Sequence, residues 1–371
     1  MSGIEKLCLT SQSTQNPSSA EQSAWEEAFS RSRSNCFPNS AVERSQLCAL
    51  IEEIHSHLRE TELQDARRIQ LAKKLELQES LLSPIRRLPP EILSEILKLV
   101  TPDTIIVQRG FRSRAGDSIF PLTWVSFWWR ETIVSQPSFW SCLELRSPEP
   151  VLGSIIPILR VCLARSGTAP ICLHLHFHQT ELTPWLCNVL DDLAQHADRW
   201  RELKSTVDLP GLTYILKQAH NLTENPFSIL DTMKIFCPFK ICAEGILGNS
   251  FVHCPRLHNL QISHLRATDI IDLTHLSMLD VIFYKGCSFA VLLEKCPVLE
   301  TLIVGYINKS LEGWETTSIP TVPRVCHAHL QTLVLIINKN VVAGAWQSVQ
   351  LPNLTDLRVQ YAGTLNITTF E

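Results

Sequence analysis

A short leucine-based unit recurs through the C-terminal half of the chain, and it limits the possible folds more than any other feature. The unit reads Leu-x-x-Leu-x-(Ile or Val). Its copies begin at Leu257, Leu276, Leu299, Leu330 and Leu354, with a looser copy at Leu230. One such unit cannot bury its own apolar face, so neighbouring units must stack to form a continuous core.

The spacing of the copies indicates a leucine-rich-repeat-like solenoid. First positions are 19 to 31 residues apart, which brackets the leucine-rich-repeat period despite irregular insertions. In three copies a proline (Pro255, Pro297 or Pro352) stands two residues before the first leucine, where it ends a helix and directs the chain into a strand. Runs such as residues 288–295 would form helices on the convex side. We expect residues 146–371 to form an irregular α/β solenoid with one parallel sheet and an extended concave surface. Strands of some other α/β domain are the alternative.

The last copy is followed closely by Glu371, without an evident polar capping segment. Solenoids need a polar outer face on their terminal unit. We therefore expect either that the chain is a shortened member of the leucine-rich-repeat-like class or that its last strand is protected by other means.

A helix signal opens the stretch from Leu88 to Trp140. Pro89-Pro90-Glu91 suits a first helical turn, because proline is tolerated there and the helix dipole favours a carboxylate. Thr101-Pro102 ends the helix, because proline lacks the amide donor. The apolar stripe between these signals consists of Ile92, Leu93, Ile96, Leu97 and Val100.

Two further helices are expected in the same stretch. Over residues 124–134, Val125, Trp129 and Ile133 recur every four residues. Gln136-Pro137 then begins a short third helix, again with proline near its first position.

The segments LPPEILSEIL and VSFWWRETIVSQPSFWSCLEL resemble the F-box domain, especially the form common in mushroom-forming fungi, which often reads LPPEIL, then VCxxWR, then TPxLW. Ser126 replaces the usual cysteine, and residues 101–121 form a longer insert than a minimal F-box has. The resemblance implies that residues 84–145 bind the Skp-type adaptor of a cullin ubiquitin ligase. The adaptor-binding residues would be Leu88, Pro89, Pro90, Ile92, Leu93, Ile96, Leu97, Val125, Trp129, Arg130, Pro137 and Trp140. The alternative is a three-helix core whose apolar residues stabilise only their own domain.

Physical arguments also favour docking by this stretch. A three-helix unit of roughly fifty residues is too small to cover all of its apolar side chains. One large aromatic buries ~150–250 Å², a transfer free energy of about 4–6 kcal/mol before ordering costs. The stretch holds Trp124, Trp128, Trp129 and Trp140, and their spacing does not decide which of them face a partner.

The N-terminal region has two parts. Residues 1–40 are rich in Ser, Gln, Asn and Thr, and we expect them to be disordered. Residues 41–83 read as a long helix or weak coiled coil, although a strict heptad would place Asp65 or Arg68 in its seam. This helix either folds against the F-box or mediates self-association through residues 41–82.

Charge and cysteine usage exclude several classes of protein. The net charge of -4 and pI of about 6.4 argue against a nucleic-acid surface. The thirteen cysteines are scattered without a CxxC pair and often lie in apolar runs, as Cys162, Cys172 and Cys242 do. They read as reduced core residues of a cytoplasmic or nuclear protein. The sequence shows no signal peptide and no apolar run of about 18 residues, so no membrane partner is expected.

Residues 142–178 read as two strands around a helix. Leu143 and Leu145 alternate with polar residues, as do Leu173 and Leu175, and residues 154–163 have helical character. The strand period places His174, His176 and His178 on one face. Three such positions make a row rather than a tetrahedral cup, so we expect a solvated face and no metal site.

The sequence offers little that suggests catalysis. It contains no GxGxxG, GxxxxGK(S/T), HExxH or GxSxG motif, so no catalytic residue and no cofactor are assigned. We therefore expect an α+β protein with a helical arm, a three-helix F-box and a leucine-rich-repeat-like solenoid. Its function would be substrate recognition for an SCF-type (Skp, cullin, F-box) ubiquitin ligase, holding an unidentified target protein. One alternative is a Skp-bound scaffold that recruits no ligase, and another is a cofactor-dependent enzyme with an accessory F-box-like domain.

Overall fold

A computed structural model of the chain describes residues 26, 30, 38–59, 65–108, 119–147, 155–177, 181–236, 247–266, 268–285, 289–307, 325–337 and 349–361. The chain divides into two compact units. The helical unit comprises Met1–Thr101 and Ile119–Ser135, and the sheet unit comprises Pro102–Ser118 and Gln136–Glu371. The expected mixture of helices and strands with a mostly parallel sheet is confirmed. The tail predicted to be disordered, residues 1–40, lies almost entirely outside the described residues.

Two helices of the helical unit, α2 (Ala41–Arg59) and α3 (Asp65–Leu82), pack against each other. A capping box starts α2: the Glu43 N–H donates to Ser40 Oγ (3.1 Å), and the Asn39 N–H donates to Glu43 Oε2 (2.8 Å). The sequence predicts one long helix here, whereas the structure has two. An apolar stripe on a helix can be buried by a second helix of the same chain as well as by a helix of another chain. The periodicity of the stripe does not show which of these partners covers it.

The remaining elements of the helical unit follow the predicted order. They are η1 (Pro84–Arg87), α4 (Pro90–Val100), η2 (Phe120–Trp124) and α5 (Phe127–Ser135). The start and end of α4 agree with the proline signals: the Leu93 N–H donates to the Pro89 carbonyl, and the Thr101 N–H donates to the Leu97 carbonyl (both 3.0 Å). Helix α4 packs on α5, and α5 packs on η2.

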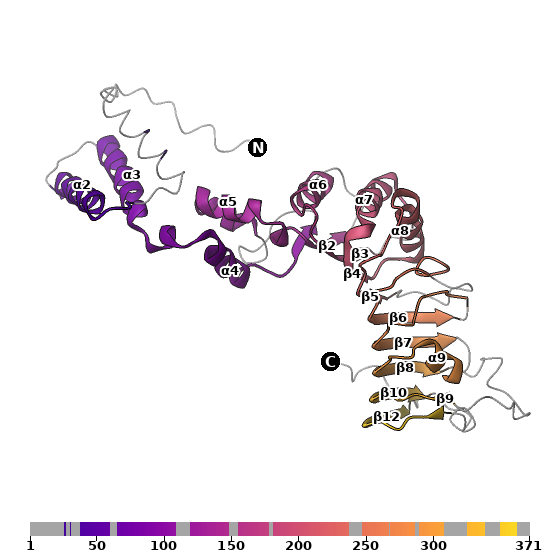
Figure 1. The fold of residues 1–371 in the computed structure, drawn as a ribbon. Helices are drawn as coiled ribbons and strands as arrows, with labels where there is room; N and C mark the ends of the chain where they lie inside the picture. Colours follow the sequence, from indigo (N-terminus) through magenta and orange to yellow (C-terminus); the bar gives the residue numbers. More distant parts are fainter. Residues whose placement is uncertain are drawn as a thin grey trace, which may run out of the picture. The chain divides into compact units, whose positions relative to one another are not determined.

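In the described part of the sheet unit, ten parallel strands form one sheet in which the strands follow each other in chain order (Figure 1). They are β1 (Ile105–Gln108), β2 (Cys142–Ser147), β3 (Ile171–Phe177), β4 (Trp200–Ser205), β5 (Thr232–Ile235), β6 (Asn259–Arg266), β7 (Met278–Lys285), β8 (Thr301–Ile307), β10 (Thr332–Ile337) and β12 (Asp356–Tyr361). A small second sheet pairs β9 (Val325–Cys326) with β11 (Val349–Gln350).

The expected boundaries of the F-box differ from those of the helical unit. The insert predicted over 101–121 contributes β1, which pairs with β2, so this part of the insert is the first strand of the sheet. The short third helix is present as η3 (Pro137–Phe139), but it belongs to the sheet unit. Pairing between β1 and β2 joins segments far apart in sequence, and local patterns do not reveal it.

Helices connect the first strands of the sheet, as parallel pairing requires. They are α6 (Ile155–Arg165) before β3, α7 (Pro184–Ala194) and η4 (Ala197–Arg199) before β4, α8 (Leu209–Leu222) before β5, and α9 (Phe289–Lys295) before β8. Helices α6, α7 and α8 lie along one side of the first strands, and α7 packs on α8 (Figure 1). That side of the sheet is the core side.

Rows of apolar residues run across the strands in register, and they form the core as far as β10, whereas Leu357 and Val359 of β12 are 58% and 56% exposed. One row is Ile105, Leu143, Leu173, Leu203, Met233, Leu260, Leu279, Leu302, Leu333 and Leu357. A second row lies two residues further along each strand and includes Leu145, Leu175, Ile235, Ile262, Val281, Val304, Leu335 and Val359. The second and third positions of all six predicted repeat units fall in these rows.

A repeated hydrogen-bond pattern joins the turns before the later strands. The Asp231 carbonyl accepts from the N–H groups of His258 and Asn259 (2.9 and 3.1 Å). The carbonyls of His258, Ser277, Glu300 and Gln331 each accept in the same way from two successive N–H groups of the next turn. Each turn is therefore held by the one before it, which accounts for stacking in chain order.

Candidate functional site

The outer face of α4 carries apolar side chains that remain open to solvent. Ile92, Ile96, Leu99 and Val100 are 50%, 39%, 86% and 60% exposed. Their spacing of four, then three or four residues places them on one side of the helix. Leu93 and Leu97 are fully buried on the other side. We call the four exposed residues the outer face of α4.

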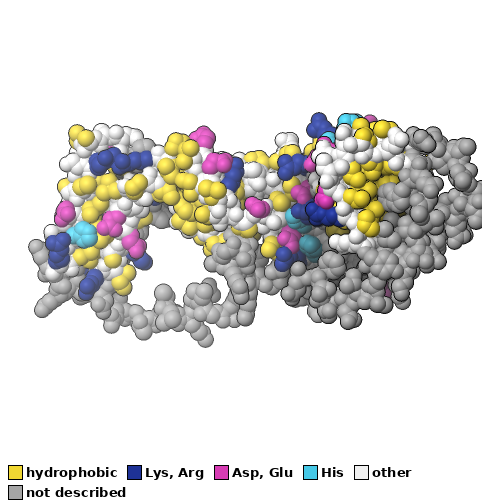
Figure 2. All heavy atoms as spheres, turned by 90° about the horizontal axis from the view of Figure 1, so that it is seen from below, with side chains coloured by type: hydrophobic (Ala, Val, Ile, Leu, Met, Phe, Trp, Pro, Cys, Tyr) yellow, Lys and Arg dark blue, Asp and Glu magenta, His cyan; other side chains and the backbone are white. Residues whose placement is uncertain are grey.

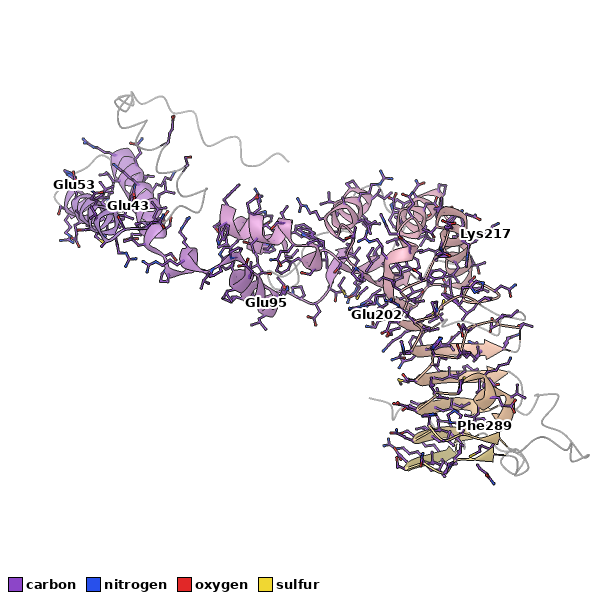
Figure 3. All side chains as sticks on the ribbon, viewed as in Figure 1. Glu43, Glu53, Glu95, Glu202, Lys217 and Phe289 are labelled. Atoms are coloured by element: carbon purple, nitrogen blue, oxygen red, sulfur yellow. The ribbon has the colours of Figure 1, made fainter. Side chains whose placement is uncertain are left out.

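Leaving apolar side chains of this kind in water costs free energy. Fully burying one such side chain is worth about 1.5–3 kcal/mol. Single exposed apolar residues are ordinary, but a contiguous group marks an interaction site. Hydrophobic side chains gather on the surface of the helical unit (Figure 2). Charged residues accompany them on α4, where Lys98 Nζ lies 2.7 Å from Glu95 Oε1, and Glu95 projects outward (Figure 3). An apolar centre with a charged rim is typical of protein interfaces.

The segment from η2 into α5 adds a second exposed apolar group in the same unit. Trp124 is 74% exposed and Val125 is 60% exposed. Trp128 and Trp129 are half-buried, whereas Ile133 is fully buried. Of the described tryptophans of this unit, Trp124 thus has the most surface to offer a partner.

The structure divides the predicted adaptor-binding residues into three groups. Those open to a partner in the helical unit are Pro89, Pro90, Ile92, Ile96, Val125 and Arg130, with Leu88 and Trp129 half-buried. Leu93 and Leu97 are fully buried, so they support the domain rather than contact a partner. Pro137 and Trp140 belong to the sheet unit.

Trp140 therefore has a structural role in place of the predicted docking role. Its side chain is fully buried, and the Arg165 guanidinium lies 4.5 Å from the centre of its ring. This cation–π contact joins the end of α6 to the start of β2. Leu99 and Trp124 were absent from the predicted set. The sequence contains a signal for Leu99, which follows Ile96 by three residues and so lies on the same side of the helix, but none for Trp124.

The second candidate surface is the side of the sheet opposite the core rows. Between the apolar positions of each strand, the alternate residues form their own row, made of Glu144, His174, Lys204, Lys234, Gln261, Asp280, Ile303, Val334 and Arg358. We call this side the open face. On β1 the row begins with Ile106. It is polar or charged from β2 to β7 and apolar on β8 and β10.

Ion pairs link the charged residues of the open face. Glu144 pairs with Arg146, and His176 Nε2 lies 3.5 Å from Glu144 Oε1. Glu202 Oε1 lies 2.6 Å from Lys204 Nζ and 3.9 Å from His174 Nε2. Glu202 lies on the side of the sheet away from Lys217 of α8 (Figure 3). The carboxylates of β2 to β4 therefore lie beside cationic groups of the same strands, which largely neutralise their charge.

Burial perturbs two groups of this face. It lowers the pKa of His174 below its ordinary value, an effect that Lys204 reinforces and Glu202 and Glu144 oppose. Burial also raises the pKa of Asp280, while Lys234 acts in the opposite direction. The expected placement of His174 and His176 on one face is confirmed by their register with Glu144 and Arg146. His178 lies outside the described residues.

Comparison with known proteins supplies no relative for this chain: models of protein families, curated proteins and solved structures all lack a significant match to it. In the part of the chain that the structure describes, no helix combines the length and apolar character needed to cross a membrane. The outer face of α4 and the open face of the sheet remain as the two surfaces whose chemistry indicates a function.

Proposed function

We propose that this chain is the substrate-recognition subunit of an SCF-type (Skp, cullin, F-box) ubiquitin ligase. The observation that carries the proposal is the outer face of α4, where four apolar residues at helical spacing are exposed while Leu93 and Leu97 fill the core. The segment before and within this helix is LPPEILSEIL, the first of the sequence blocks that resemble an F-box. The Skp-type adaptor would cover the outer face of α4.

The composition of the surface supports a protein partner. Trp124 and Val125 offer large apolar area, and aromatic residues dominate the binding energy of protein interfaces. Arg130 is exposed on α5, where a charged group at the rim would orient the partner. Leu88 and Trp129 are half-buried, so they would contribute to the interface through part of their side chains.

The sheet unit would hold the target protein. We interpret its stacked parallel strands as a leucine-rich-repeat-like solenoid, because the predicted repeat positions share two core rows and successive turns share one hydrogen-bond pattern. The open face then provides a broad surface with charged and apolar parts. The subunit would act in the cytoplasm or nucleus by raising the effective concentration of a target lysine, and other subunits would carry out the transfer chemistry.

Co-elution in gel filtration tests this function. The full chain is mixed with purified Skp-type adaptor and cullin, alongside an Ile92→Asp, Ile96→Asp variant. A matched control places the same substitution at Val161, an exposed apolar residue of α6 that is 42% exposed. The proposal expects the wild type and the Val161→Asp chain to elute with both subunits and the α4 variant to elute alone. Co-elution with the adaptor but without cullin would instead identify a Skp-bound scaffold.

A further inference from the structure

Two cysteines face each other on neighbouring strands at the edge of the charged part of the open face. Cys142 of β2 is the direct register partner of Cys172 of β3. The Cys172 N–H donates to the Ser141 carbonyl (2.8 Å), which fixes the strands beside the pair. Both cysteines are free, and a hydrogen bond joins their thiols. Neither Cys142 nor Cys172 contributes to the adaptor-binding surface on α4.

The backbone already places the two residues at a separation suited to a disulfide. Adjacent strands lie about 4.7–4.9 Å apart, and disulfide-linked residues have Cα atoms roughly 4.4–6.8 Å apart. Direct register partners in a sheet have side chains that leave the same face. The Cα separation expected for this pair therefore falls within the range that a disulfide spans.

The surroundings make Cys172 the nucleophile of the pair. The Cys142 thiol hydrogen-bonds to it, and an Arg201 Nη2 N–H donates to its sulfur across 3.5 Å. Together these contacts outweigh burial and lower the pKa of Cys172 to about 6. The same hydrogen bond and burial raise the pKa of Cys142, so one proton stays with the pair on Cys142. The two directions favour the thiolate on Cys172 and the thiol on Cys142.

Cys162 and Cys254, two further described cysteines of the sheet unit, lack these features. Burial raises the pKa of Cys162 and of Cys254 to about 12. Both side chains are fully buried. Cys172 is itself buried, with 8% of its surface exposed, and its partner Cys142 is partly exposed on the open face. Since the thiolate is the reactive form, Cys162 and Cys254 serve as internal references for the reactivity of Cys172.

We propose that Cys142 and Cys172 form a redox-active dithiol that hydrogen peroxide converts to a disulfide. The Cys172 thiolate attacks one peroxide oxygen, so that an S–O bond forms, the O–O bond breaks and hydroxide leaves. Cys142 Sγ then attacks the resulting sulfenic sulfur; the S–S bond forms, the S–O bond breaks, and water leaves with the Cys142 proton. Two thiols lose two electrons, and the peroxide is reduced to two waters once the released hydroxide takes up a proton. Arg201 loses its anionic partner, so the charge of the open face changes with oxidation.

The test is peroxide titration of the purified full chain at pH 7, followed by alkylation of the remaining thiols, digestion and mass spectrometry. The proposal expects a Cys142–Cys172 cross-link at about one equivalent of peroxide, before Cys162 or Cys254 is oxidised, and its reversal by dithiothreitol. Cys142→Ser should leave Cys172 as a sulfenic acid that dimedone captures. Oxidation that reaches Cys162 and Cys254 as readily as the pair, or no cross-link in the folded wild type, overturns the proposal.

A second measurement isolates the role of Arg201. The rate of Cys172 alkylation by iodoacetamide is followed against pH in the wild type and in Arg201→Gln, which removes the charge from an exposed side chain. Arg160→Gln on α6 is the matched control, because Arg160 is likewise exposed and pairs with Asp192 instead. The midpoint of the pH profile should rise in Arg201→Gln and stay unchanged in Arg160→Gln. Equal midpoints in all three chains contradict the assigned role of Arg201.

Discussion

Ile92 and Leu93 are consecutive residues of α4, yet half of Ile92 is exposed while Leu93 is fully buried. Neighbouring positions on a helix point about 100° apart, so one apolar pair can serve two surfaces. Leu93 belongs to the core of the helical unit, and Ile92 belongs to the surface proposed to bind the adaptor. The two sides of this helix therefore respond differently to substitution.

Leu97→Ala should destabilise the helical unit, and Ile96→Ala should leave its stability almost unchanged. Removing a fully buried leucine side chain costs about 2–5 kcal/mol, because it leaves a cavity. Ile96 is partly in solvent, so its truncation should cost roughly 1 kcal/mol or less. Urea unfolding of the full chain, followed by tryptophan fluorescence, measures the free energy of unfolding of both variants. Similar losses for the two variants would contradict the assignment of sides.

Gly305→Ala should weaken the pairing of β7 with β8. A Cβ atom at Gly305 would clash with the Ile282 carbonyl oxygen, and a backbone atom has no other rotamer to adopt. The strands would have to separate locally, at a cost of about 1–3 kcal/mol. Thermal unfolding provides the measurement, with Thr301→Ala on the same strand as the control. A melting temperature for Gly305→Ala equal to that of the wild type would show that this close approach is relaxed.

Asp280→Asn should stabilise the chain at neutral pH. Burial raises the pKa of Asp280 in the folded state, so the folded state binds this proton more strongly than the unfolded state does. The ionised carboxylate consequently costs stability above its ordinary pKa of 3.8, and the cost disappears below that value. Denaturant unfolding of Asp280→Asn and of the wild type should show a higher free energy of unfolding for the variant at pH 7 and no difference at pH 3. The exposed Asp103, changed to Asn, should give no gain at either pH.

His174 should make stability fall as the pH drops below 6.5. Its pKa is lowered in the folded state, mainly by burial, so the unfolded state takes up the proton first. The stability contribution of the neutral ring is complete above 6.5 and is lost as the pH falls toward the lower, folded-state pKa. His174→Gln should flatten the stability profile between pH 7 and pH 5. His275→Gln, at an exposed position, should leave the slope unchanged, and an equal effect of both would refute the explanation.

Elements with strong local signals could be predicted from the sequence. Proline and apolar spacing placed α4 within residues 88–101, and the structure has it at Pro90–Val100. Alternation placed β2 and β3, and the helix expected over residues 154–163 is α6 (Ile155–Arg165). The repeat units located β6, β7, β8, β10 and β12, because each places apolar residues in the same two rows. These residues are buried from β6 to β10, whereas Leu357 and Val359 of β12 are 58% and 56% exposed.

Features that depend on distant partners could not be predicted in the same way. The strand β1 lies in the predicted insert, and its pairing with β2 becomes evident only when both strands are in place. Cys172, predicted from its apolar neighbours to be a core residue, is buried as expected, with 8% of its surface exposed. Its side chain nevertheless leaves β3 on the open-face side with His174 and accepts a hydrogen bond from Arg201. The parity of the strand could have shown this, since Cys172, His174 and His176 alternate with buried leucines. Cys242, expected to be a core residue, lies outside the described residues.

Titration calorimetry of the purified full chain with the purified Skp-type adaptor tests the central claim most directly. Wild type, Ile96→Asp and Leu99→Asp are compared with Val161→Asp as the control. If the outer face of α4 binds the adaptor, the two α4 variants should bind at least about 30-fold more weakly, a loss of ~2 kcal/mol, because each buries a charge at the centre of the interface. Val161→Asp should bind as the wild type does. Equal affinity in all four chains, or no binding by the folded wild type, would contradict the proposed role of α4.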